Sequence, residues 1–440
     1  MSELDTLLEA LSALHPRRID LSLGRIERLL DRLGRPQDRL PPVLHLAGTN
    51  GKGSTVAFLR AMLEAAGKTA HVYTSPHLVR FNERIRLAAP GGGELVDDAT
   101  LIEAIRHVLE VNGKDPITFF EVTTAVAFHL FSTRPADYCL LEVGLGGRLD
   151  ATNVVAEPLA AAIASVSYDH VDFLGEDLAG IAAEKAGILK RGRPAIVGPQ
   201  NEHALAMIVL EAEARGATLV RQGVEYTAFA EHGRLVYQDE RGLLDLPLPR
   251  LPGAHQVENA GLAIAILRAA DIALDMSAME SGVLTADWPA RLQRLRTGPL
   301  VKAAPPGSDI WLDGGHNPLA GSAIAQAMAE FEERDPRPLV LVCGMLTTKS
   351  PEGYFRPFAG LARHAMTVPV PDSDAGFDPE TLAAIAMEVD VPAAPFASVH
   401  AALDWLRADH DEESDPPRIL ICGSLYLAGD VLKENGVMPA

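Results

Sequence analysis

The sequence predicts an α/β protein: a P-loop domain built on a mostly parallel sheet with a small antiparallel insert, followed by a smaller, Rossmann-like C-terminal α/β domain. Three observations predict it. Short apolar runs alternate with helical periodicity for most of the chain, which indicates parallel strands joined by helices. A glycine-rich loop at residues 48–54 connects one such run to the helix that follows it. A segment with two prolines and three arginines, residues 288–299, separates two regions of this alternation.

The first region alternates strands and helices. Its apolar runs are near-continuous, as expected for strands that are buried on both faces. The predicted strands are Val43–Ala47, Ala70–Tyr73, Asp137–Val143 and Ala160–Val166. The predicted helices, from their 3.6-residue periodicity, are Ser54–Ala66, Asp98–Val111, Thr118–Phe131 and Asp177–Leu189.

Short runs with turn residues at Val224–Leu248 predict the small antiparallel insert. Helices are predicted after it at Val257–Ala270 and Met276–Thr285. Beyond the segment 288–299, strands are predicted near Ile310 and at Leu339–Cys343, Ala365–Val368 and Ile419–Cys422. We therefore predict two domains, residues 1–295 and 296–440.

The composition excludes several function classes. Lys and Arg number 39 against 59 Asp and Glu, a formal charge of −20, so the chain has no general attraction for nucleic acid or an anionic membrane. Any anionic substrate must be held by a local cluster of positive groups. No basic and apolar leader opens the sequence and no apolar run reaches about 18 residues, so we expect a cytoplasmic protein without a membrane span. The three cysteines, in separate apolar runs, are expected to be buried thiols: Cys139, Cys343 and Cys422.

The strongest functional motif is the loop Gly48-Thr49-Asn50-Gly51-Lys52-Gly53-Ser54. Its glycines allow successive backbone N–H groups to turn toward one anion, and the helix that follows adds its dipole. Lys52 can bridge the β- and γ-phosphates of ATP, and the Ser54 hydroxyl can bind Mg²⁺. The spacing departs from the usual P-loop, because Leu46 replaces the first glycine and Gly53 separates the lysine from Ser54. The strand and the helix on either side still predict a nucleotide site.

Further motifs follow this loop in order along the chain. They are Thr74-Ser75-Pro76-His77-Leu78, Phe81-Asn82-Glu83-Arg84-Ile85-Arg86, Thr118-Phe119-Phe120-Glu121, residues 142–153, Asp169-His170, Glu184-Lys185-Ala186-Gly187-Ile188, His255-Gln256 with Asn259, residues 289–293, residues 313–318 and Cys422-Gly423-Ser424-Leu425-Tyr426. The series resembles the folylpolyglutamate synthase and dihydrofolate synthase family, which is related to the Mur ligases. The resemblance spans nearly the whole chain and implies an ATP-dependent amide ligase.

Glu142 is the first candidate metal ligand. It ends a predicted buried strand and precedes a glycine-rich loop, and in α/β sheets ligands bind at the carboxyl ends of strands. Its carboxylate suits Mg²⁺, which prefers oxygen ligands. The resemblance adds His170 as a ligand, and it places Ser75 with Ser54 on the nucleotide-bound ion. One or two Mg²⁺ ions are implied, and Mn²⁺ can substitute because imidazole is an unusual ligand for Mg²⁺.

Lys185 is the third ligand that the resemblance implies. A bare ammonium would be repelled by Mg²⁺. In related ligases the equivalent lysine is carbamylated, and the resulting anion can bind metal. We therefore expect Lys185 to carry a carbamate.

The resemblance implies further ATP contacts from the second half of the chain. Asn259 is expected on the adenine side, and Asp313 and His316 approach ATP from the opposite side, with Asp313 toward the ribose. Arg291, in the segment between the predicted domains, is expected to reach the phosphates. Its permanent charge and bidentate fork suit that role.

The acceptor site is expected around residues that could hold a pteroate. Three residues supply ring contacts and a carboxylate for the N–H edge of a pterin: Phe119, Phe120 and Glu121. By resemblance, the N-terminal segment that helps to hold dihydropteroate contains Leu21 and Leu23. The motif at residues 142–153 contributes Leu149, Asp150 and Ala151.

The implied reaction joins a carboxylate to the amine of L-glutamate. ATP transfers its γ-phosphoryl group to the carboxylate, and the amine attacks the resulting acyl phosphate. Lys52 and Arg291 would stabilise the charge that develops during transfer. A second metal, held by Glu142, His170 and the modified Lys185, would steer the incoming amine and the oxyanion of the intermediate. The acceptor is dihydropteroate, the glutamate tail of a reduced folate, or both, and the family implies a monomer.

Two alternatives stay open on the sequence. A Mur-type ligase would join an amino acid to a cell-wall precursor, although the motifs at residues 75–78 and 423–426 favour the folate branch. A nucleotide switch would need no metal-binding carboxylate, histidine and lysine, and the chain has no Asn-Lys-x-Asp guanine-reading motif.

Overall fold

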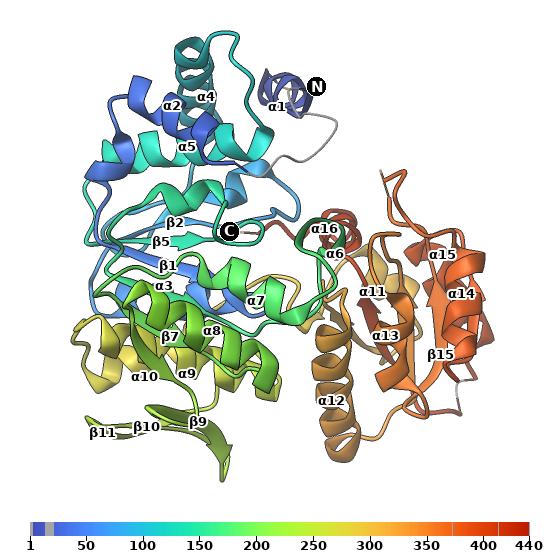
Figure 1. Cartoon of the computed structure of the whole chain (residues 1–440). Coiled ribbons are helices and arrows are strands. Elements are labelled where there is room, and N and C mark those ends of the chain that lie inside the picture. The colour runs from blue at the N-terminus through green and yellow to red at the C-terminus, as the bar shows by residue number, and fades with distance from the viewer. Residues whose placement is uncertain (1–2, 14–21, 372, 412, 440) are drawn as a thin grey trace.

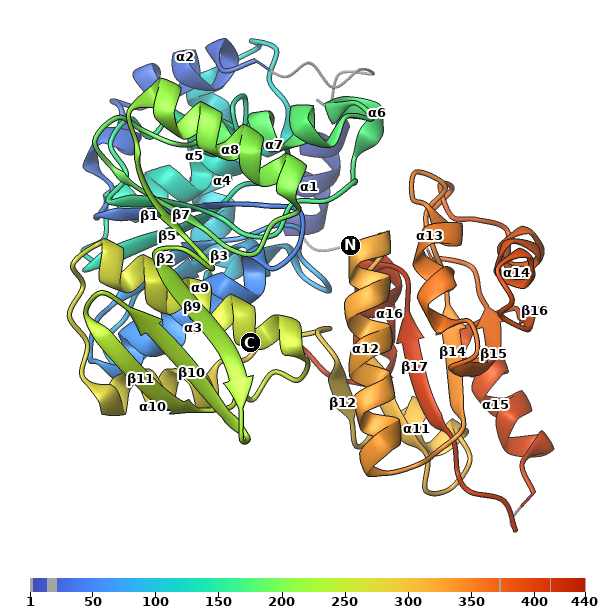
Figure 2. The same ribbon diagram turned by 60° about the horizontal axis from the view of Figure 1, so that its bottom comes forward.

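The computed structural model describes residues 3–13, 22–371, 373–411 and 413–439; Leu21, a predicted acceptor contact, lies outside them. Within these ranges the chain forms a larger N-terminal body and a smaller C-terminal body beside it (Figure 1; Figure 2). The described strands make an eight-stranded, a three-stranded and a six-stranded sheet. The predicted α/β class with an antiparallel insert is confirmed.

The eight-stranded sheet forms the centre of the larger body. Its strands are β1 (Val43–Ala47), β2 (Ala70–Tyr73), β3 (Ile85–Leu87), β4 (Glu94–Leu95), β5 (Tyr138–Glu142), β6 (Ala160–Ile163), β7 (Pro194–Val197) and β8 (Thr218–Arg221). Their order is β4-β3-β2-β5-β1-β6-β7-β8, and only β3 and β4, at one edge, pair antiparallel. The central place of β1 puts the glycine-rich loop in the middle of the carboxyl edge.

Helices cover both faces of this sheet. They are α1 (Glu3–Ala13), α2 (Gly24–Arg32), α3 (Lys52–Ala65), α4 (Asp98–Asn112), α5 (Phe119–Ser132), α6 (Val171–Leu174), α7 (Leu178–Ala186), α8 (Glu202–Arg215), α9 (Ala254–Ala269) and α10 (Met276–Thr285). Successive strand residues point to opposite faces. Leu44 and Leu46 of β1 therefore pack with α3, α9 and α10, whereas Val43 packs in the cluster of α2, α4 and α5 and Ala47 in that of α7 and α8.

The antiparallel insert consists of β9 (Tyr226–Glu231), β10 (Arg234–Asp239) and β11 (Gly242–Pro247). It packs on α9, where a Cβ on Gly261 would lie 2.2 Å from the Cβ of Ala228. Glycine at that position therefore allows the insert to approach the helix closely.

The smaller body is built on the six-stranded sheet, in the order β12-β13-β17-β14-β15-β16. The strands are β12 (Gln293–Leu295), β13 (Asp309–Leu312), β14 (Leu339–Cys343), β15 (Ala362–Thr367), β16 (Ala393–Pro395) and β17 (Arg418–Cys422). The helices are α11 (Pro299–Ala303), α12 (Pro318–Arg334), α13 (Pro351–Phe355), α14 (Pro379–Glu388), α15 (Val399–Asp409) and α16 (Leu425–Glu434). Figure 2 shows α12 and α16 on the side that faces the larger body.

The segment 288–299 carries more structure than a linker. Residues Gln293–Leu295 form β12, which pairs antiparallel with β13. The six-stranded sheet therefore begins just before residue 296, where we predict the second domain to start. The domain division itself stays a prediction.

The remaining differences from the predicted elements have local causes. β6 ends at Ile163, before the predicted Val166, because the backbone at Ser165 bonds to the glycine-rich loop instead of a neighbouring strand. Thr118 and Asp177 are N-caps, not first helical residues, since their side chains accept backbone N–H groups of the first turn. The three cysteines are free and buried in strands, as expected. Among the described helices, none combines the length and apolar character needed to cross a bilayer.

Arg418 provides a test of the smaller body. Its guanidinium is 3% exposed and lies 3.2 Å from Asp309, its partner on the adjacent strand. Removing one member of a buried ion pair costs about 3–5 kcal/mol, because the other charge stays buried. Asp309 would keep Arg294 at 2.6 Å, so we expect Arg418→Met to lower the free energy of unfolding by about 3 kcal/mol.

The measurement is urea unfolding followed by tryptophan fluorescence in variants that keep Trp311 and carry Trp288→Phe and Trp405→Phe; the Trp311 indole N–H donates to Asp309 at 2.8 Å. Arg334→Met, at the exposed end of α12, is the matched control and should stay within about 0.5 kcal/mol of the parent. Equal losses in the two variants would contradict the buried-pair account.

Candidate active site

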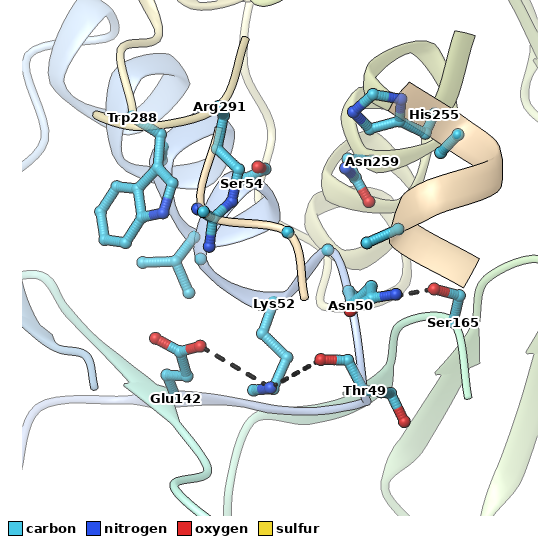
Figure 3. Close-up of a pocket in the computed structure, with 18 of the residues that line it drawn as sticks. Thr49, Asn50, Lys52, Ser54, Glu142, Ser165, His255, Asn259, Trp288 and Arg291 are labelled. Atoms are coloured by element: carbon cyan, nitrogen blue, oxygen red, sulfur yellow. Dashed lines mark hydrogen bonds and ion pairs between the residues drawn. The ribbon is translucent and has the colours of Figure 1, made fainter. Parts of the chain in front are cut away.

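The loop between β1 and α3 is held against the segment that follows β6. The amide of Thr49 donates to the carbonyl oxygen of Ser165 at 2.8 Å, and its hydroxyl donates to the carbonyl oxygen of Ser167 at 3.0 Å. Ser165 also contacts the backbone of Asn50 through its hydroxyl (Figure 3). These bonds fix the loop so that the N-terminus of α3 opens into the space between the two bodies.

Two glycines of the loop are required by conformation and by space. Gly48 has a φ of 148° and Gly51 a φ of 86°. A Cβ on Gly48 would lie 2.9 Å from the Cβ of Ala164, and one on Gly51 would lie 2.3 Å from Oδ1 of Asn259. Any side chain at either position would displace a neighbouring segment.

Lys52 and Glu142 face each other at the start of α3 and the end of β5. The Lys52 ammonium donates to the carbonyl oxygens of Gly48 at 3.0 Å and Thr49 at 3.1 Å, and lies 4.0 Å from a Glu142 carboxylate oxygen (Figure 3). The other oxygen of Glu142 accepts the amide of Ser75 at 3.2 Å. Burial raises the pKa of Glu142, and the charge of Lys52 opposes that rise. A bound cation would favour the ionised carboxylate in the same way.

Lys185, near the end of α7, is buried against the same loop. Its ammonium donates to the carbonyl oxygen of Gly48 at 3.1 Å, so Lys185 and Lys52 share one acceptor. Burial, followed by the charge of Lys52, lowers the pKa of Lys185 to about 7. The neutral amine, which is the form that reacts with CO₂, is therefore well populated near pH 7. This environment favours the carbamate that we expect at Lys185.

The groups around the loop fit a hard divalent cation. Glu142 supplies a buried carboxylate, and Ser54 and Ser75 line the same cavity with hydroxyl groups. His170 lines it as well, with 45% of its side chain exposed. Within the described ranges no three His, Cys, Asp or Glu side chains are grouped to hold a metal. A metal ion at this site would therefore depend on hydroxyl groups and on the Lys185 carbamate as further ligands.

Asp169 joins the two bodies. Its carboxylate lies 2.6 Å from Nζ of Lys349 and 3.4 Å from Nε2 of His316, both from the smaller body. The side chains of Asp169 and Lys349 are 8% and 10% exposed. Burial alone would raise the pKa of Asp169, but His316, His170 and Lys349 outweigh it and hold that pKa well below its usual value. Asp169 is therefore an anion that ties the loop after β6 to the smaller body.

A second polar contact links the glycine-rich loop itself to the smaller body. The side-chain amides of Asn50 and Asn317 exchange two hydrogen bonds, of 3.0 and 2.9 Å. Asn317 is the N-cap of α12, where it accepts the amide of Ala320, and its amide nitrogen also donates to Asp169. A shift of α12 must therefore break contacts of the loop.

Most of the predicted ATP and metal residues line one cavity of about 770 Å³ between the two bodies. These are Thr49, Asn50, Gly51, Lys52, Gly53, Ser54, Ser75, Glu142, His170, Asn259, Arg291, Asp313 and His316. Gly48 and Lys185 do not line it, but they bond to each other through the Gly48 carbonyl oxygen. In Figure 3, Arg291 and Trp288 lie on one side of the loop, and His255 and Asn259 lie on the other.

Arg291 is presented by a strained turn. Its neighbours Ala290 and Leu292 have φ values of 54° and 41°, in the left-handed region that disfavours side chains. Asp313 is 3% exposed and accepts the amides of Leu292 at 2.8 Å and Gly315 at 2.7 Å. The Asp313 carboxylate thus holds the turn that carries Arg291, in addition to lining the cavity.

The predicted acceptor residues are not among those that line this cavity. Phe119 and Phe120 are half-buried, and the ring of Phe120 lies against Gly144, which does line it. The carboxylate of Glu121 is bonded to Arg25 at 3.1 Å and to the amide of Thr118 at 2.7 Å. Glu121 therefore already closes the capping box of α5.

The second group of predicted acceptor residues has a structural role in the loop after β5. Asp150 is buried and accepts the amides of Gly144, Leu145 and Thr152. Ala151 packs in the cluster of α4 and α5, whereas Leu149 and Leu23 are half-buried. Pteroate contact by these residues stays a prediction.

Sequence reasoning did not assign roles to Asp169, Lys349 and Asn317. Asp169 and Asn317 lie in the motifs Asp169-His170 and 313–318, whose other members were assigned to the metal or to ATP. Their place in these motifs was the signal that could have identified them. Trp288 was also missed: its indole packs so closely on the loop that a Cβ on Gly53 would lie 2.7 Å from it. No spacing rule pairs residue 169 with residue 349, because folding alone brings them together.

Comparison with known proteins accounts for this arrangement. Residues 46–267 match the family model of the Mur ligase middle domain. The chain is 34% identical over 434 residues to the dihydrofolate synthase/folylpolyglutamate synthase of Escherichia coli K12, which covers 98% of this chain and 95% of that protein.

Solved structures agree over the same length. FolC of E. coli, in complex with DHPP and ADP, has a TM-score of 0.86 at 33% identity and covers 98% of this chain and 97% of its own. The bifunctional folylpolyglutamate synthase/dihydrofolate synthase of Yersinia pestis, with AMPPNP and a Mn ion, has a TM-score of 0.85 at 31% identity and covers 98% of both chains. The chain therefore belongs to the dihydrofolate synthase/folylpolyglutamate synthase family.

Proposed function

We propose that this protein is an ATP-dependent ligase that joins L-glutamate to dihydropteroate, to the glutamate tail of a reduced folate, or to both, through an acyl phosphate. One observation carries the proposal: a single cavity brings the glycine-rich loop of the larger body against Arg291 of the joining segment and against Asp313 and His316 of the smaller body. The family supports the same reaction, since the E. coli relative is named for both activities. The enzyme is expected to act as a cytoplasmic monomer.

The loop and Arg291 supply the charge needed to activate a carboxylate. A carboxylate carbon is a poor electrophile, and transfer of the γ-phosphoryl group of ATP gives it a good leaving group. Lys52, at the N-terminus of α3, and Arg291, on its strained turn, would stabilise the negative charge on the phosphoryl oxygens during transfer. Bound Mg²⁺ or Mn²⁺ would neutralise phosphate charge, held by Ser54, Ser75, Glu142, His170 and the Lys185 carbamate.

The contacts between the bodies serve the second half of the reaction. An acyl phosphate is hydrolysed by water unless the amine of glutamate reaches it first. The buried Asp169–Lys349 pair and the Asn50–Asn317 amides hold the smaller body over the loop and exclude solvent. The part of the segment 288–299 that precedes β12 would act as the hinge.

The first test is phosphate release from ATP in the presence of L-glutamate. We expect release to depend on dihydropteroate or a reduced folate, and not on UDP-muramyl precursors. With an ¹⁸O-labelled acceptor carboxylate, one label should appear in the released phosphate, because an acyl phosphate transfers that oxygen when the amine displaces it. If no label appears in the released phosphate, the acyl phosphate is contradicted. Release of phosphate without any acceptor would favour a nucleotide switch.

The second test concerns Lys185. With ¹³C-bicarbonate we expect a carbamate carbonyl signal that increases from pH 6 to pH 8. The sign follows from the pKa of about 7, since the reactive neutral amine is gained as the pH rises through that value. Lys185→Ala should remove the signal and lower kcat about 10–100-fold, as is typical for a lost metal-site partner.

Lys190→Ala is the matched control. Lys190 lies five residues after Lys185 and is half-buried. Its ammonium donates to the carbonyl oxygen of Asn153 at 3.4 Å. This variant should keep both the signal and the activity. If the parent protein shows no ¹³C carbamate signal and Lys185→Ala keeps full activity, the carbamate is ruled out.

The third test removes one member of the buried ion pair between Asp169 and Lys349. Lys349→Met leaves the Asp169 carboxylate buried without its nearest cation, a change worth about 3–5 kcal/mol. We expect a fall of more than about 100-fold in kcat/KM and a larger radius of gyration with ATP bound, measured by small-angle scattering. The double variant Asp169→Asn/Lys349→Met should recover part of the compaction. Equal scattering curves for the parent and Lys349→Met would show that the pair does not hold the bodies together.

A further inference from the structure

Two guanidinium groups line the cavity at a distance from the predicted nucleotide contacts. Arg60 and Arg86 both belong to its wall. Arg60 lies eight residues after Lys52 on α3, which corresponds to about 12 Å along the helix axis. Asn259, which we expect on the adenine side of ATP, lies against Gly51, at the end of α3 that is opposite to Arg60. The two arginines therefore form a part of the cavity beyond the phosphate loop.

Strand register places Arg86 opposite α3. Val72, Arg86 and Leu95 are direct cross-strand neighbours on β2, β3 and β4, so their side chains share one face of the sheet. Val72 packs in the same apolar cluster as Val56 of α3. Val72, Arg86 and Leu95 form a row across the three strands, and all three line the cavity together with Val56. Arg60, one turn beyond Val56, therefore faces the row that contains Arg86. The result is an apolar wall that carries two positive groups.

Arg60 forms no ion pair with the described residues of this wall, although Glu64 and Glu94 lie close enough to raise the pKa of Arg86. Among the described residues Arg60 has no hydrogen bond or ion pair, and Glu64, one turn further along α3, accepts the amide of Gly93 at 3.0 Å instead. Arg86 donates to the carbonyl oxygen of Gly93. Burial, followed by the charge of Arg60, lowers the pKa of Arg86 to about 10. Two neighbouring cations in a protein with a net charge of −20 indicate a site for an anion.

We propose that Arg60 and Arg86 bind the α-carboxylates of the glutamate tail of a folate acceptor, a role that rests on the proposed function. A γ-linked glutamyl unit has five bonds of about 1.5 Å along its chain and spans roughly 6 Å. Two units thus cover the roughly 12 Å between Lys52, where the reacting carboxylate is activated, and Arg60. Each unit offers one carboxylate and two methylene groups, which match the arginines and the apolar residues Val56, Val72 and Leu95.

The test compares acceptors that differ only in tail length. Titration calorimetry with ADP present would give the Kd of tetrahydrofolate with one and with three glutamates, so no turnover is required. We expect Arg60→Gln to raise the Kd of the triglutamate about 10-fold, the effect of losing one charge-assisted hydrogen bond. The Kd values of the monoglutamate and of dihydropteroate should stay within about 2-fold of the parent. Arg60→Lys should restore most of the triglutamate affinity.

Arg334→Gln, which removes the same charge at the exposed end of α12, is the control and should change none of these values. A second variant, Arg86→Gln, should repeat the selective effect of Arg60→Gln. Equal changes for both tail lengths, no change for the triglutamate, or a weakened affinity for ADP would overturn the tail site. If the parent protein binds neither pteroates nor folates, the proposed function fails; if it binds them and Arg60→Gln has no selective effect, only the tail site fails.

Discussion

The hydrogen bonds between the glycine-rich loop and the backbone after β6 set the position of the loop on which the nucleotide side of the site is built. Thr49 bonds to Ser165 and Ser167, so the loop cannot move without the sheet. The carbonyl oxygen of Gly48 accepts hydrogen bonds from Lys52 of α3 and Lys185 of α7. This turn of the backbone thereby brings the side chain of Lys185 next to that of Lys52, and its close packing requires glycine at residues 48 and 51.

The cavity between the bodies gathers charged side chains of both signs. Lys52, Arg60, Arg86 and Arg291 line it, together with the carboxylates of Glu83, Glu142, Asp169, Glu258, Asp287 and Asp313. Positive groups crowded in a partly desolvated space attract anionic substrates and also repel one another. Burial, followed by the charge of Lys52, lowers the pKa of Lys185, where a neutral amine is the chemically useful form.

The two bodies meet through polar contacts at the site and through apolar contacts at α16, where Leu78 and Val79 pack against the cluster that contains Leu427 and Val431. Asp169, Lys349 and His316 form a buried charged group, and Asn50 pairs with Asn317. Such contacts demand defined geometry, because a buried charge without its partner is costly. They are suited to an enzyme that must open for substrates and then exclude water, since a small displacement breaks them together.

Much of the fold and part of the site followed from the sequence. Continuous apolar runs identified β1, β2, β5, β14 and β17, and the glycine-rich loop with Glu142 at a strand end identified the nucleotide side of the cavity, because these features depend on residues that are close in the chain. The sequence alone could not show that Glu121 meets Arg25 from 96 residues away, that Asp169 meets Lys349 from 180 residues away, or that Arg60 and Arg86 line the same cavity. Those pairings depend on strand order, on register and on the placement of the second body. They were decided by tertiary structure, since local spacing determines which way a side chain points but not what it meets.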